Sequence, residues 1–150
     1  LRDDCITEIM VNGTDNIFIE KLGSLYQSDS CFEDEKRLND IKQQLFDSLE
    51  FSEKVLGENH RFSRSIAFKD NTKTLNRSLF DVITVCFSEI KDKERFKLKK
   101  DIFYEKFINL LQDERSDFSK AIVEGTSTKK AIEDRFRIMN DLIKGIMNEN

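Results

Sequence analysis

The residues that most enzymes use for nucleophilic or metal chemistry are scarce in this sequence. His60 is its one histidine, and the three cysteines, Cys5, Cys31 and Cys86, stand far apart with no CxxC spacing. A nucleophilic site needs Cys or Ser beside a histidine, and an ordinary zinc site needs several Cys or His ligands. Cys86 falls among apolar residues at helical spacing, which predicts an inert core thiol. We therefore predict no catalytic residue, no metal site and no cofactor in this chain.

Basic residues gather in two segments of a chain whose net charge is −4. Residues 60–77 hold five bases and one acid, and residues 91–100 hold six bases and two acids, so each segment carries +4. If the two segments meet at one end of the fold, they form a surface for DNA phosphates, which Lys and Arg bind without reading bases. Otherwise they are solvated helix faces and loops. The predicted nucleic-acid-binding residues are Arg61, Arg64, Lys73, Arg77, Lys93, Lys97 and Lys100.

A second candidate for anion binding is the turn of small residues that follows Gly125. Thr126, Ser127, Thr128 and Lys129 lead into a helix, whose free N–H groups and dipole attract anions. The glycine spacing of a phosphate-binding Walker loop is absent. Simple capping of the helix by Ser or Thr explains the same residues without a ligand.

The elements that position these residues are predicted to be helices throughout. The chain has no Pro and 5 Gly, and 13 of its 15 aromatic residues are Phe, so the residues that punctuate sandwiches and hairpins are nearly missing. Its 150 residues suit one domain with a real hydrophobic core. We predict an all-α fold, an irregular bundle of six to seven helices in a single domain over residues 1–150.

The spacing of apolar residues places these helices along the chain. Val82, Ile83, Cys86 and Phe87 are expected at the centre of the bundle, because the helix that carries them has little polar surface. Residues 60–74 have weak periodicity and are expected to form an ordered loop or a broken helix. Asp92 and Ser116 are expected to cap two of them, and Thr126, Ser127 and Thr128 are three candidate caps for the last helix. The predicted helices cover residues 3–10, 16–26, 33–56, 75–90, 92–113 and 116–125, followed by a last helix that extends through residue 146.

Composition also bears on location. An odd number of widely spaced cysteines argues against a disulfide framework and favours a reducing compartment, so a cytoplasmic location is expected. Charge interrupts every apolar run, which predicts no membrane span. The chain opens on Leu1 rather than Met, and its first ten residues lack the features of a signal peptide. We therefore expect a fragment of a longer protein.

Several stretches of the sequence resemble one known family when they are taken together. They are residues 2–9, Leu25-Tyr26, residues 49–57 with Arg61-Phe62, residues 76–81, and Gly125-Thr126-Ser127 leading to Arg135. They resemble the C-terminal helical half of the domain-of-unknown-function family found in the first half of GmrSD-type modification-dependent restriction endonucleases. The N-terminal lobe of that family has a ParB and sulfiredoxin-like nuclease fold and carries an Asp-Gly-Gln-Gln-Arg motif. That motif is absent here.

The resemblance implies a helical accessory lobe of a restriction or phage-defence nuclease. Such a lobe would support a nucleotide-hydrolysing N-terminal lobe, which would be its partner, and would contact DNA. Three polar positions could then face the cleft between the lobes: Asn76, Arg77 and Arg135. The alternative for Arg77 and Arg135 is that acids such as Asp81 or Asp134 hold them inside the fold. The competing function is a helical protein-interaction scaffold with no role in nucleic-acid binding.

Overall fold

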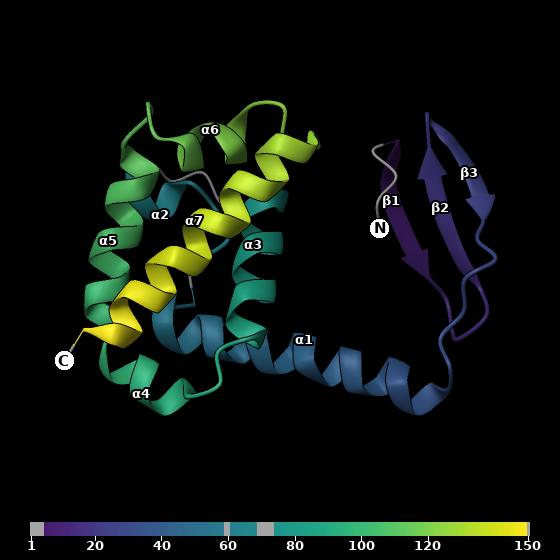
Figure 1. Cartoon of the computed structure of the whole chain (residues 1–150), viewed down its shortest axis with the longest axis horizontal. Coiled ribbons are helices and arrows are strands. Elements are labelled where there is room, and N and C mark those ends of the chain that lie inside the picture. Colours follow the sequence, from purple (N-terminus) through teal and green to yellow (C-terminus); the bar gives the residue numbers. More distant parts are fainter. Residues whose placement is uncertain (1–4, 59–60, 69–73, 150) are drawn as a thin grey trace. The chain divides into compact units, whose positions relative to one another are not determined.

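The computed structural model describes residues 5–58, 61–68 and 74–149. Within these ranges it contains a three-stranded antiparallel sheet as well as seven helices (Figure 1). The strands follow one another in the sheet in chain order, and they are β1 (Ile6–Val11), β2 (Ile17–Lys21) and β3 (Ser24–Gln27). The prediction of an all-α fold is therefore wrong: residues 3–10 and 16–26 supply strands where helices were expected.

The sheet has a local cause in the sequence. Leu22 and Gly23, between β2 and β3, both have positive φ angles, 53° and 75°, as in the type I′ turns that close two-residue hairpins. Ile19 pairs with Ile9 on one side and Tyr26 on the other, so the three side chains share one face of the sheet. The β-branched and aromatic residues of the strands, among them Ile9, Ile17, Phe18 and Ile19, favour extended backbone in this region.

The helices predicted for the rest of the chain are present, with one division. The helix expected over residues 92–113 is two helices that meet at Lys99, and the segment after residue 60 contains one short helix. The helices are α1 (Glu35–Leu56), α2 (Ser65–Phe68), α3 (Arg77–Ser88), α4 (Lys93–Leu98), α5 (Lys100–Gln112), α6 (Asp117–Val123) and α7 (Lys129–Asn148).

Polar side chains begin several of these helices, α3, α4, α6 and α7 among them. In each case a side-chain oxygen accepts a hydrogen bond from the backbone N–H three residues later, which satisfies one of the free donors at a helix start. These caps fix where α3, α4, α6 and α7 begin, and hence the direction in which each leaves its loop. The capping residues are Asn76, Asp92, Ser116 and Thr128.

The chain divides into two compact units, Leu1–Gln44 and Leu45–Asn150, and the division falls inside α1. We call them unit 1 and unit 2. Unit 1 contains the sheet, with ten acidic and five basic residues and a net charge of −5. Unit 2 contains α2 to α7, with nineteen acidic and twenty basic residues and a net charge of +1. The acidity of the chain thus resides in unit 1.

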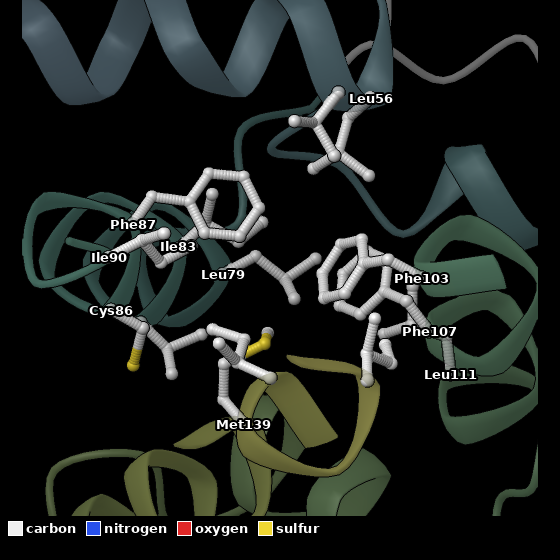
Figure 2. Packing of buried hydrophobic residues seen from close by; sticks show 14 of the residues in the cluster. Leu56, Leu79, Ile83, Cys86, Phe87, Ile90, Phe103, Phe107, Leu111 and Met139 are labelled. Carbon is white, nitrogen blue, oxygen red and sulfur yellow. The ribbon is translucent and has the colours of Figure 1, made fainter. Parts of the chain in front are cut away.

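The hydrophobic core of unit 2 contains a cluster of phenylalanine rings among aliphatic side chains. Phe87 of α3 lies 5.5 Å from Phe51 of α1 and 5.5 Å from Phe103 of α5, measured between ring centroids. Figure 2 shows Met139 of α7 directed toward this cluster of α3 and α5 side chains. The predicted centre is confirmed, because the four residues expected there are at most 1% exposed: Val82, Ile83, Cys86 and Phe87.

Candidate nucleic-acid interface

The described residues of the two basic segments lie at opposite ends of α3. Asn76 precedes this helix and donates from its side-chain amide to the carbonyl oxygen of Ile122 in α6. Lys91 and Lys93 follow the other end of α3 and lead into α4. The twelve residues of α3 span about 18 Å at the rise of an α-helix, and Figure 1 shows α6 and α4 at opposite ends of this unit. The structure therefore does not join the two segments into one surface.

In the first segment, two of the three arginines contact neighbouring residues. Arg61 donates to the carbonyl oxygen of Glu58 at 2.9 Å and stacks over the ring of Phe62 at 5.1 Å. The guanidinium of Arg64 stands 5.0 Å from the ring centroid of Phe68. Arg77 is exposed at the start of α3. Lys73, also predicted to bind DNA, lies outside the described residues.

The second segment forms a basic corner around α4. Three exposed bases, Lys91, Arg95 and Lys100, take part in no ion pair within the described residues. Leu98 stands among them in the sequence with 88% of its surface exposed. We call these four residues the α4 corner. Its cations are free to meet an external anion without first breaking an internal contact.

Lys93 and Lys97 lie on a different side of α4. They line a cavity of about 260 Å³ together with Asp47 and Glu50 of α1, so acids lie close to both lysines. The ammonium of Lys93 also stands 5.5 Å from the ring centroid of Phe51, and Lys97 pairs with Glu94 at 3.7 Å. Of the seven residues predicted to bind DNA, Lys100 alone therefore belongs to the α4 corner, while Lys91 and Arg95 of this corner were not among the predicted residues.

The turn before α7 is explained by its own hydrogen bonds. The hydroxyl of Thr128 accepts from the backbone N–H of Ala131 at 3.3 Å, and the carbonyl oxygen of Thr126 accepts from Arg135 at 2.6 Å. Ser127 and Lys129 are exposed. Capping of α7 thus accounts for the threonine that begins the helix, and Thr126 serves as a tether for a buried arginine.

The polar residues assigned to a cleft between lobes have different surroundings. Arg135 is buried within unit 2, with its side chain 6% exposed, and it donates to the carboxylate of Asp81 at 2.9 Å. Asn76 both caps α3 and tethers it to α6. Arg135 is thus held inside the fold by Asp81, which was one of the two acids considered as its partner. The other acid, Asp134, pairs with Arg137. Arg77 remains exposed.

Comparison of the chain with protein-family models, curated proteins and solved structures finds no match. The function is therefore inferred from the chain's own residues. Within the described ranges no helix is long and apolar enough to cross a membrane. In the same part of the chain, no three His, Cys, Asp or Glu side chains gather where they could hold a metal ion.

Burial, followed by the nearby charges of Glu89 and Asp81, raises the pKa of Cys86 to about 12. Cys86 is accordingly a thiol at neutral pH and a poor nucleophile.

Proposed function

We propose that this chain is an accessory lobe of a GmrSD-like restriction or defence nuclease, built from the sheet and the helices described above, and that the α4 corner contacts DNA phosphates. The observation that carries the DNA contact is the set of three exposed, unpaired cations in one short stretch of unit 2. Phosphate contacts need only such cations, and they position a protein on the duplex without reading its sequence.

The accessory-lobe proposal rests on the family resemblance, and a contact between two of the resembling stretches supports it. Asp81 belongs to the stretch that begins at Asn76, and Thr126 and Arg135 belong to the stretch that begins at Gly125. Arg135 binds both Asp81 and Thr126, so the two stretches are joined by one buried side chain. Residues that hold a lobe together are expected to be shared among proteins with that lobe. Under this proposal, nucleotide hydrolysis belongs to a separate catalytic lobe, which this lobe supports.

The DNA contact predicts a specific dependence of affinity on salt. Neutralising three phosphates gives a log–log slope of about −2.7, so affinity should fall about 40-fold between 50 and 200 mM salt. Replacing Arg95 and Lys100 by glutamine should reduce the slope to about −0.9, because one contact remains. Fluorescence anisotropy of a labelled duplex, titrated with the full chain at several salt concentrations, measures both slopes.

The matched control carries Lys129→Gln and Lys130→Gln, which remove the same charge from the exposed start of α7. This variant should keep the slope of the unmodified chain. A salt-independent affinity would contradict the DNA contact. Equal losses in the two double variants would also contradict it, since the effect would then follow from net charge and not from the α4 corner.

A further inference from the structure

The loop between β1 and β2 contains Asn12-Gly13, the one Asn-Gly pair in the sequence. Both residues are exposed, and the backbone N–H of Asn12 closes the loop by donating to the carbonyl oxygen of Asn16 at 2.9 Å. Within the described residues, neither the side-chain amide of Asn12 nor the backbone N–H of Gly13 takes part in a hydrogen bond. A side-chain amide carbon and a backbone nitrogen are therefore adjacent in the chain, and both are open to solvent.

The conformation of Gly13 leaves its nitrogen accessible. Its φ angle is 88°, in the left-handed region, and a Cβ added to it would meet no atom within 4 Å. Glycine has no side chain that shields this nitrogen or restricts rotation of the neighbouring backbone. The nitrogen of Gly13 can therefore approach the Cγ atom of Asn12.

We infer that Asn12 is a site of spontaneous deamidation. Hydroxide removes the proton from the backbone nitrogen of Gly13, and this nitrogen forms a bond to Cγ of Asn12, which closes a succinimide ring. The bond from Cγ to the side-chain nitrogen breaks, and that nitrogen leaves as ammonia with a proton from water. A water molecule then opens the ring at one of its two carbonyl groups. The product is aspartate or, where the backbone now runs through the side chain, isoaspartate.

Asparagines inside the helices lack this arrangement and serve as internal controls. Asn39 lies in α1 and Asn140 in α7, and each precedes an aspartate. In a helix, the backbone N–H of the following residue donates to a carbonyl oxygen one turn earlier, so it is held away from the side-chain amide. Both asparagines should remain unchanged in the folded chain while Asn12 reacts.

Either product changes unit 1. Aspartate adds one negative charge, which takes the net charge of this unit from −5 to −6. Isoaspartate also adds one carbon atom to the backbone between Val11 and Ile17, which are paired across β1 and β2. The length of a hairpin loop helps to fix which residues pair, so the longer backbone should weaken this register. The reaction should thus destabilise the sheet and leave unit 2 folded.

The test follows the mass of the full chain during incubation in neutral and mildly alkaline buffers. Replacement of an amide by a carboxyl group raises the mass by about 1 Da, and tandem mass spectrometry of peptides assigns the residue. Asn12 should react about 10-fold faster for each rise of one pH unit, because the concentration of hydroxide rises by that factor. Methyl transfer by a protein isoaspartyl methyltransferase detects the isoaspartate product.

Two matched variants test the role of the neighbouring glycine. Gly13→Ala and Gly23→Ala each add a methyl group to a glycine with positive φ in a loop of the same sheet, and neither methyl meets an atom within 4 Å. Gly13→Ala should slow the reaction of Asn12 at least about 10-fold, because the methyl group hinders the attacking nitrogen. Gly23→Ala introduces similar strain but leaves that nitrogen unchanged, so the rate should alter less than about 3-fold.

Three results would overturn the inference. An unchanged Asn12 in the full chain, under conditions in which a synthetic peptide of residues 8–17 deamidates, would mean that the folded loop protects it. Equal rates at Asn12 and Asn140 would mean that the loop has no special reactivity. Equal rates in the two glycine variants would mean that the residue after Asn12 does not control the reaction.

Discussion

Phe87→Ala is expected to lower the free energy of unfolding of unit 2 by about 3 to 5 kcal/mol, the usual cost of removing a buried phenylalanine ring. Phe87 has no exposed surface and packs edge-on against Phe51, Phe96 and Phe103, with ring centroids 5.5 to 5.8 Å away. Its removal deletes three aromatic contacts at once. The surrounding rings come from α1, α4 and α5, so few of them can move to fill the cavity without shifting a helix.

Denaturant unfolding followed by circular dichroism measures this loss. The control is Phe46→Ala, because Phe46 of α1 also belongs to unit 2 but is 60% exposed. That change should cost less than about 1 kcal/mol, as for surface positions in general. Similar losses in the two variants would contradict the assignment of Phe87 to the centre of the core.

The second large effect concerns the ion pair of Asp81 and Arg135. Removing the acid should lower the free energy of unfolding more than removing the base. Asp81→Asn leaves the guanidinium of Arg135, 6% exposed, without its counter-charge, and should cost about 3 kcal/mol. Arg135→Met keeps apolar volume in the same place and leaves a carboxylate that is 46% exposed and can be solvated by water. That variant should cost about 1 kcal/mol, which is the ordinary cost of a lost hydrogen bond.

A double-mutant cycle measures this asymmetry by denaturant unfolding of both single variants and the double variant. In the double variant, the buried cation is absent, so the loss of Asp81 should add little to that of Arg135→Met. Equal costs for the two single variants, or additive costs in the double variant, would contradict the claim that burial of the guanidinium sets the energy of this pair.

Apolar spacing was sufficient to predict most helices of unit 2, although it merged α4 and α5 into one helix. Asp92 and Ser116 cap the helices they were expected to cap, and Thr128 is the one of three candidate residues that begins α7. These signals are local, since a cap and an apolar face are both complete within a few turns of chain. Such local signals therefore predict a helix without knowledge of the fold.

The sheet was missed because its signals are short and were outweighed by composition. Leu22 and Gly23 make a two-residue turn that carries no Pro, Asn or Asp to mark it. The scarcity of Gly and Pro in the whole chain favoured helices, but one glycine at the right position is enough for one hairpin. Ile17, Phe18 and Ile19 are β-branched and aromatic residues that favour a strand, but the run is only three residues long.

The candidate interface depended on relations that sequence spacing does not contain. One basic segment precedes α3 and the other follows it, so the length of this helix separates them. The contact of Arg135 with Asp81 spans 54 residues, so no local pattern marks it. The sequence was sufficient to show that residues 91–100 are basic. The structure was needed to show which of these cations form no ion pair within the described residues.

The division of the chain inside α1 also has an optical consequence. The sequence contains no tryptophan and two tyrosines, of which Tyr26 lies in unit 1 and Tyr104 in unit 2. The intrinsic fluorescence of the protein therefore comes from one emitter in each unit. In a Tyr104→Phe chain, tyrosine emission reports on the sheet alone, and in a Tyr26→Phe chain it reports on the helices alone. One conservative substitution thus separates the melting of the two units without any added dye.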